Sequence, residues 1–218
     1  MTNKDLFLEG NSIADHYIKQ YTYPFEVLPY IKDIIIKIGN SLDDNYYLLK
    51  ENVWISKTVT LPNNITINGP CIIDHNAEIR CGAYIRGNVI IGKNSVLGNS
   101  CEIKNSIMYD SVQVPHFNYV GDSILGNFAH MGAGSITSNV KGNKTNVVIK
   151  GEKSMETNLR KVGAFLGDYA EIGCNAVLNP GTIIGVNTTV YPLVMVRGVI
   201  ESNKIVKSIN NIVEKEIR

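Results

Sequence analysis

The hydrophobic residues in the middle of the chain follow a strict period of six. In steps of six from Ile55 to Ile103, every residue is Ile or Leu, and the residue two positions earlier is small or aliphatic. A helix has a period of 3.6 and a half-exposed strand a period of two, so neither element alone produces this pattern. The aliphatic positions are Ile55, Leu61, Ile67, Ile73, Ile79, Ile85, Ile91, Leu97 and Ile103.

A coil of three short strands explains the period, because each strand contributes one inward aliphatic residue before a turn. Eighteen residues then form one triangular coil, and the same phase returns from Leu166 to Val196. Glycines directly after aliphatic residues, such as Gly92 and Gly173, suit tight corners. The pattern therefore predicts an all-β solenoid rather than a β-sandwich. The expected columns are Ile55–Ile73–Ile91, Leu61–Ile79–Leu97 and Ile67–Ile85–Ile103.

The sequence before the repeat has a helical pattern. Ser12 is a candidate cap for one short helix, and Tyr23-Pro24 precedes a second helix that carries the apolar run around residues 31–38. We expect a helical N-terminal segment over residues 1–49 and the solenoid over residues 50–198.

The sequence after the repeat also predicts a helix, over residues 199–218. Its apolar positions, Ile205, Ile209, Ile212 and Val213, share one helical face. Two roles remain open for this C-terminal helix: covering the unpaired strand edges at the end of the solenoid, and packing against a neighbouring subunit.

The repeat is interrupted twice, and function in a solenoid usually lies at interruptions. Residues 110–131 contain Pro115-His116, and a histidine is a candidate general base near neutral pH, although a turn residue is the plainer interpretation. An inserted loop at about residues 137–162 is rich in Lys and Arg. A basic loop beside a break in the coil suits a phosphate group, and a solvated loop is the alternative.

Composition narrows the class of protein. The chain has 218 residues, 44% hydrophobic and 19% charged, as expected for a globular protein. A formal net charge of +1 gives no electrostatic reason to expect nucleic acid. No apolar run is long enough to cross a membrane, and no signal peptide is evident at the N-terminus. Four cysteines without CxxC spacing favour a reduced, cytoplasmic protein without a zinc site.

Three segments together resemble a known family. They are residues 98–104, the run Pro115-His116-Phe117-Asn118-Tyr119-Val120-Gly121-Asp122, and residues 132–139. They resemble the acetyltransferase domain of the bifunctional N-acetylglucosamine-1-phosphate uridyltransferases, and more closely the archaeal-type sugar-1-phosphate nucleotidyltransferases that carry such a domain. Residues 161–168 add to the second likeness. The resemblance covers about residues 80–198 and implies a left-handed parallel β-helix of hexapeptide repeats.

The resemblance also implies a reaction and a site. The family moves an acetyl group from acetyl-CoA to the amine of an amino-sugar 1-phosphate, such as glucosamine or galactosamine 1-phosphate, and requires no metal for this transfer. The family is trimeric, with active sites between subunits. Its general base corresponds to His116, and Asn139 corresponds to a residue that orients the nucleophile or stabilises the oxyanion. Acceptor-binding positions correspond to Arg86, Lys104, Tyr119 and Lys144, and the pantetheine groove corresponds to Ala133, Cys174 and Pro192.

The chain departs from the family at several positions. His130 and Val140 replace a family asparagine and tyrosine, which leaves the identity of the sugar open. No glycine-rich nucleotide-binding loop occurs in residues 1–50, so we expect no uridyltransferase activity.

Two other readings of the fold compete with an acetyltransferase. A γ-type carbonic anhydrase needs three histidines on zinc, and His16, His75, His116 and His130 do not have that family's spacing. A non-catalytic trimeric scaffold or regulatory subunit is the stronger alternative. The retained set of Arg86, Lys104, His116, Tyr119 and Asn139 argues against it.

Overall fold

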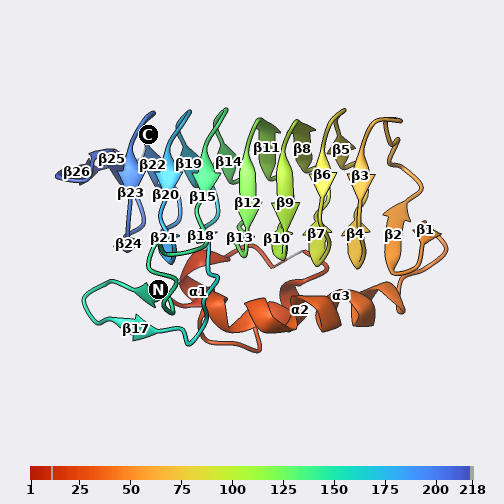
Figure 1. The fold of residues 1–218 in the computed structure, drawn as a ribbon, viewed down its shortest axis with the longest axis horizontal. Coiled ribbons are helices and arrows are strands. Elements are labelled where there is room, and N and C mark those ends of the chain that lie inside the picture. Colours follow the sequence, from red (N-terminus) through yellow and green to blue (C-terminus); the bar gives the residue numbers. More distant parts are fainter. Residues whose placement is uncertain (11, 217–218) are drawn as a thin grey trace.

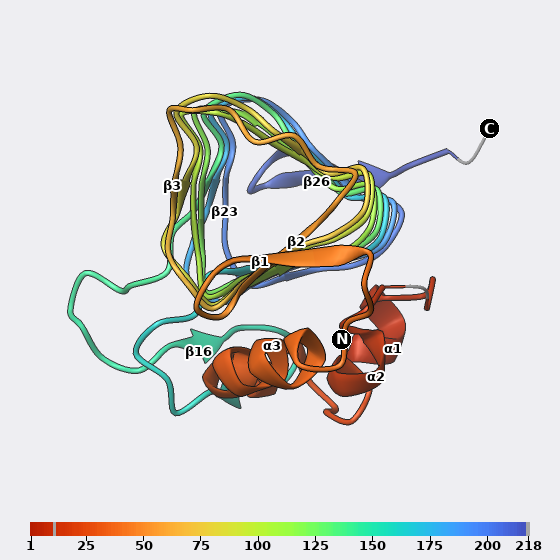
Figure 2. The same cartoon turned by 90° about the vertical axis from the view of Figure 1, so that its right-hand side faces the viewer.

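A computed structural model describes residues 1–10 and 12–216, and its main body is a triangular solenoid (Figures 1 and 2). The fold is the left-handed parallel β-helix of the expected class. Each coil runs from the first sheet to the second, then to the third and back to the first. We name the three corners of the triangle by the two sheets that meet there.

The strands of the described residues group as follows. The first sheet contains β1 (Tyr46–Lys50), β2 (Val53–Ser56), β4 (Cys71–Ile73), β7 (Val89–Ile91), β10 (Ser106–Met108), β13 (Ile124–Leu125), β18 (Ala164–Leu166), β21 (Thr182–Ile184) and β24 (Val199–Ile200). The second contains β5 (Glu78–Ile79), β8 (Val96–Asn99), β11 (Gln113–His116), β14 (His130–Met131), β19 (Glu171–Ile172), β22 (Thr189–Val190), β25 (Lys204–Ser208) and β26 (Asn211–Glu214). The third contains β3 (Thr66–Ile67), β6 (Tyr84–Ile85), β9 (Glu102–Lys104), β12 (Tyr119–Gly121), β15 (Ile136–Thr137), β20 (Val177–Leu178) and β23 (Met195–Val196).

The inward aliphatic residues stack as the repeat predicts. Ile55 pairs with Ile73 and Ile73 with Ile91 in the first sheet, and Ile67, Ile85 and Ile103 form the equivalent column in the third. In the second sheet Ile79 pairs with Leu97, but Leu61 lies outside the strands. The expected columns are therefore confirmed except at Leu61, where the first coil is still irregular.

From β4 to β21 the first sheet is buried on both faces, which distinguishes it from the other two. Its outward residues, such as Ile72, Ile107 and Phe165, are fully buried together with the inward ones. Strands covered on both sides have continuous apolar runs rather than alternation. The sequence contains such a run in five strands of the first sheet: CII in β4, VII in β7, SIM in β10, AFL in β18 and TII in β21.

The N-terminal segment provides this cover. It consists of α1 (Asn3–Leu6), α2 (Asp15–Ile18), the 3-10 helix η1 (Pro24–Tyr30) and α3 (Ile31–Gly39), which lie along the outer face of the first sheet (Figures 1 and 2). Phe7 stacks on Tyr109 with ring centroids 4.9 Å apart, and Asp168 accepts hydrogen bonds from the backbone of Leu8 and Glu9. Helices thus occur where the sequence predicts them, although Ala14 rather than Ser12 is the capping position of α2.

The insertion leaves the solenoid between β15 and β18. It contains the antiparallel pair β16 (Val148–Ile149) and β17 (Met155–Glu156), which lies beside the N-terminal segment (Figure 2). The chain then re-enters the first sheet, where β18 pairs directly with β13. The insertion is therefore an excursion at the third–first corner, and the coils before and after it remain stacked.

The predicted C-terminal helix is wrong. Residues 204–214 form the antiparallel hairpin of β25 and β26, and β25 continues the second sheet by pairing with β22. Apolar residues at 205, 209, 212 and 213 fit a helical face, but they are β-branched, and the open edge of β22 supplies hydrogen bonds that a helix would leave unused. Only Val206 of this hairpin is fully buried.

No helix of the described residues is long and apolar enough to pass through a membrane.

Candidate functional site

His116 lies in a column of equivalent positions along the second–third corner. Each backbone carbonyl of this column accepts a hydrogen bond from the next coil, from Gly134 N to His116 O (3.0 Å), from Asn175 N to Ala133 O (2.9 Å) and from Leu193 N to Cys174 O (2.9 Å). His116, Ala133, Cys174 and Pro192 therefore follow one another on successive coils. The residue after each has a positive φ: Phe117 (54°), Gly134 (72°), Asn175 (55°) and Leu193 (65°).

Asn118 fixes the turn that presents His116. Its side chain is 2% exposed; Oδ1 accepts a hydrogen bond from the backbone N–H of His116 (3.0 Å), and Nδ2 donates to the carbonyl of Gly132 (2.8 Å). The imidazole itself is exposed, and within the described residues no hydrogen bond occupies its ring nitrogens. A free ring nitrogen held on a rigid corner is what a general base requires.

An apolar groove of about 340 Å³ runs beside this column. Its lining includes Cys174 and Pro192 from the column, together with His130, Glu171 and Tyr191. Nδ1 of His130 lies 2.9 Å from Oε2 of Glu171, and this hydrogen bond raises the pKa of His130 above its ordinary value. The groove suits a thin, mostly apolar chain. Ala133 lies in the same column but does not line the groove.

A second polar cluster lies at the opposite edge of the third sheet, at the third–first corner. Nζ of Lys104 is 2.7 Å from Oδ2 of Asp122, and Nδ2 of Asn139 donates to the same carboxylate and to the hydroxyl of Tyr119 (3.2 Å). Asp122 is 4% exposed and Asn139 9% exposed. The structure thus brings Lys104, Tyr119 and Asn139 together around one carboxylate.

Asp122 is a residue to which the sequence analysis gave no role. It accepts hydrogen bonds from Lys104, Asn139 and Nδ2 of Asn105 (3.0 Å). Burial and the negative charge of Asp122 both raise the pKa of Tyr119, so that the phenol stays protonated. The sequence did contain an indication of this role, because Asp122 follows Gly121 at a corner of the coil. A carboxylate buried at a corner needs hydrogen-bond donors or cations around it.

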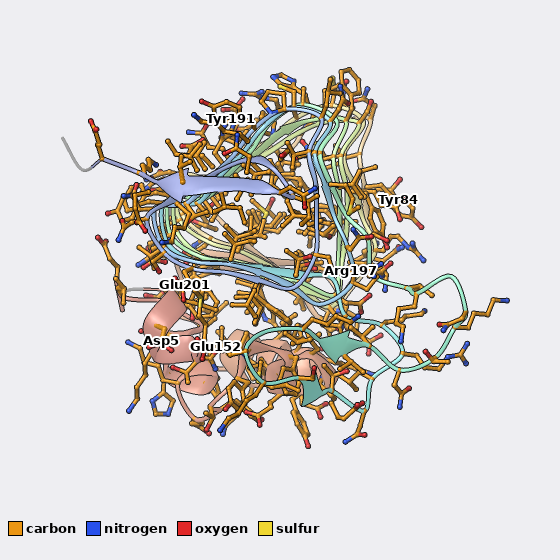
Figure 3. All side chains as sticks on the ribbon, turned by 90° about the vertical axis from the view of Figure 1, so that its left-hand side faces the viewer. Asp5, Tyr84, Glu152, Tyr191, Arg197 and Glu201 are labelled. Carbon is orange, nitrogen blue, oxygen red and sulfur yellow. The ribbon has the colours of Figure 1, made fainter. Side chains whose placement is uncertain are left out.

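Arg86 lies one coil before Lys104 and reaches back over the third sheet. Its Nη1 is 2.6 Å from Oε1 of Glu102, and this hydrogen bond raises the pKa of the guanidinium. Cζ of Arg86 lies 6.0 Å from the ring centroid of Tyr84. Tyr84 projects from the outer face of this sheet (Figure 3). Arg86 and Lys104 thus place two cations along one edge of a half-exposed aromatic surface.

Two expected site residues, His116 and Lys144, lie outside the polar cluster around Asp122 within one chain. Lys144 is exposed on the loop that projects outward from the third–first corner (Figure 2). His116 lies at the far edge of the third sheet from Lys104, with the three-residue strand β12, about 10 Å long, between the two corners. In the described part of the chain, no group of three or more His, Cys, Asp or Glu side chains converges as a metal site would require.

Comparison with known proteins gives one consistent kind of relative. The family model described as the GMPPB C-terminal domain matches residues 67–158. The chain is 32% identical over 198 residues to the bifunctional sugar-1-phosphate nucleotidylyltransferase/acetyltransferase of Sulfurisphaera tokodaii, which covers 82% of this chain and 48% of that protein. It is 32% identical over 195 residues to the bifunctional protein GlmU of Methanococcus aeolicus, covering 81% of this chain and 47% of that protein.

Among solved structures, the fold is similar to the polySia-specific acetyltransferase NeuO, with a TM-score of 0.47 and 14% identity over 77% of this chain and 88% of that one. The sequence matches confirm the resemblance to the bifunctional sugar-1-phosphate nucleotidylyltransferase/acetyltransferases. The chain spans about half the length of the curated relatives it matches.

Proposed function

We propose that this relative of the sugar-1-phosphate nucleotidylyltransferase/acetyltransferases is an acetyl-CoA-dependent N-acetyltransferase whose acceptor is an amino-sugar 1-phosphate. One observation carries the proposal: at one edge of the exposed third sheet lies a histidine whose ring makes no hydrogen bond with any described residue, and at the other edge lies a pair of cations. An apolar groove begins on the histidine side. In glucosamine 1-phosphate and galactosamine 1-phosphate the amine and the phosphate are on adjacent carbons, so an acceptor bound at the cations meets the histidine of a neighbouring subunit rather than that of the same chain.

His116 is the general base of the proposed reaction. The acceptor nitrogen attacks the thioester carbonyl of acetyl-CoA, His116 takes the proton that the amine loses, and collapse of the tetrahedral intermediate forms the C–N bond and breaks the C–S bond. The thiolate of CoA leaves and takes up a proton. Asn118 is a positioning residue here, because it holds the backbone of His116.

Asn139 orients the acceptor amine rather than the oxyanion. Both N–H directions of its amide are used, one toward Asp122 and one toward Tyr119. The amide oxygen, which accepts hydrogen bonds, is the part that remains for a ligand, and an amine N–H is a suitable donor to it. An oxyanion would need a free N–H donor.

Arg86 and Lys104 bind the acceptor phosphate. Asp122 uses one of the three N–H donors of the Lys104 ammonium and fixes its direction, so that donors remain for an anion. The guanidinium of Arg86 presents a planar set of donors that suits phosphate oxygens. Tyr119, between the two edges of the sheet, contacts the sugar ring.

The complete site is formed between subunits of a homotrimer. The pantetheine arm lies in the groove along Cys174 and Pro192 and continues past Ala133 of the same column, where it contacts mainly backbone. The loop that carries Lys144 projects away from its own solenoid, so it is placed to reach a neighbouring copy (Figure 2). A lysine in that position completes the anion site of the next subunit.

Product analysis tests the proposed function. Purified protein is mixed with acetyl-CoA and either glucosamine 1-phosphate or galactosamine 1-phosphate, with and without EDTA, and the N-acetylated sugar is identified by mass spectrometry. We expect product with at least one acceptor and no effect of EDTA. Binding of CoA without product from either acceptor would contradict acetyl transfer to an amino-sugar 1-phosphate.

A further inference from the structure

A groove extends from the acceptor phosphate cluster, between the N-terminal segment and the insertion. Its inner part, of about 510 Å³, is lined by apolar atoms of Leu28, Pro29, Val140 and Leu159 and by Arg160 and Lys161. Its outer part, of about 690 Å³, shares Pro29 and Leu159 with the inner part and continues to a group of aromatic side chains. We call the two parts together the interface groove.

The inner end of the interface groove is directly connected to the acceptor cluster. Asn105 lines it, and the amide of Asn105 donates to Oδ1 of Asp122 (3.0 Å) and to the carbonyl of Leu28 (3.3 Å). Lys104 contacts the other oxygen of the same carboxylate. One buried carboxylate therefore separates the cation that holds the acceptor phosphate from the wall of the groove.

The inner end of the interface groove carries two positively charged side chains that can bind an anion. Arg160 and Lys161 are both exposed, and neither makes an ion pair with any residue that the structure describes. Two unpaired cations beside a phosphate-binding edge favour a second phosphate rather than a neutral group.

The outer end has the opposite character. Tyr30 is 49% exposed and stacks on Tyr21 with ring centroids 5.7 Å apart, so one aromatic face is open to a ligand. Glu26 and Glu156 also line this end. Carboxylates repel phosphate but accept hydrogen bonds from the N–H groups of a heterocyclic base, and open aromatic faces stack on bases.

We propose that the interface groove binds the nucleotide part of a nucleoside diphosphate, with the nucleoside-side phosphate at Arg160 and Lys161 and the base on Tyr30. In this proposal, which rests on the proposed function, the acceptor phosphate is the sugar-side phosphate of a nucleoside-diphosphate amino sugar. The groove thereby selects the nucleotide-linked acceptor over the simple sugar 1-phosphate. The same chemistry would also admit a free nucleotide, and the test separates these sources.

Calorimetry with UDP, dTDP, GDP and ADP tests the binding step in the intact protein. We expect at least one of these nucleotides to bind, and the double variant R160A/K161A and the single variant Y30A to weaken that binding at least about tenfold. The variant K153A removes an exposed lysine of the same insertion that lines neither part of the groove, and it should leave binding unchanged. Absence of binding with all four nucleotides, or equal binding in R160A/K161A and the wild type, overturns the proposal.

Acetyl transfer identifies the source of the nucleotide. The nucleotide-linked amino sugar whose base binds best should have a kcat/KM at least about tenfold above that of the sugar 1-phosphate, and R160A/K161A should remove only this advantage. Free nucleotide should inhibit competitively with that acceptor, and non-competitive behaviour overturns the acceptor assignment. Transfer to sugar 1-phosphates without nucleotide binding overturns the groove alone. Nucleotide binding without transfer to any amine overturns the proposed function alone.

Discussion

Nζ of Lys104 lies 2.7 Å from Oδ2 of Asp122, and the two side chains are only 15% and 6% exposed. The pair joins two consecutive coils, and the same carboxylate holds the amides of Asn105 and Asn139. A buried carboxylate with one ammonium and two amides around it is fixed in position. The acceptor cluster is therefore rigid before any ligand arrives.

Removal of this carboxylate should destabilise the protein. D122A leaves the Lys104 ammonium largely buried without a counter-charge, and we expect the free energy of unfolding to fall by about 3 kcal/mol. K104M/D122A removes both charges and should recover part of that loss. Urea denaturation of D122A, K104M and K104M/D122A measures the coupling energy between the two side chains. If the losses of the two single variants simply added up in the double variant, the proposed ion pair would be contradicted.

The His130–Glu171 pair should make stability depend on pH. The hydrogen bond to Glu171 raises the pKa of His130 above 6.5, so the pair stabilises the folded state fully below pH 6.5. This contribution is lost as the pH rises through the raised pKa. The difference in Tm between the wild type and E171Q should therefore be larger at a pH of about 5.5 than at about 9.

The variant E78Q is the matched control for that experiment. Glu78 lies on the same sheet and pairs with Arg80 at 2.7 Å, and an arginine stays charged across this range of pH. Its effect on Tm should be the same at both pH values. If the effect of E171Q on Tm were equally independent of pH, the stabilising role of the His130–Glu171 pair would be refuted.

The N-terminal segment should detach when the outer face of the first sheet loses a large side chain. Phe165 is fully buried at an outward position, and F165A should lower the free energy of unfolding by about 3–5 kcal/mol. V96A, at an outward and partly exposed position of the second sheet, should cost about 1 kcal/mol or less. Limited proteolysis within residues 1–49 should accelerate only in F165A, and equal cleavage in both variants would argue against this packing.

Most of the fold follows from the spacing of aliphatic residues. Ile55, Ile73 and Ile91 had to face inward together because a period of six admits only a three-stranded coil, and the pairings confirm it. The cover of the first sheet was also visible, in uninterrupted apolar runs such as Val89–Ile91, but the periodic residues alone do not show which face is covered. The hairpin of β25 and β26 could not be predicted by periodicity, because the edge of the neighbouring strand β22 decides its structure.

The candidate site was predicted less completely than the fold. Motif comparison supplied His116, Lys104 and Asn139, but it did not show that Asp122 joins Lys104 and Asn139 through space, because sequence spacing contains no distances. Arg160 gains its proposed role only because η1 and the insertion meet at one corner. Such relations between distant segments depend on tertiary packing and could not be obtained from local pattern.

The central claim is that His116 accepts the proton of the acceptor amine. The most direct test is the steady-state release of CoA thiol from acetyl-CoA by wild type and H116A, with glucosamine 1-phosphate or galactosamine 1-phosphate as acceptor. We expect kcat to fall about a hundredfold to ten-thousandfold in H116A, with unchanged folding and CoA binding, because His116 is exposed and makes no side-chain hydrogen bond within the described residues. Equal acceptor-dependent rates in H116A and the wild type would contradict the account.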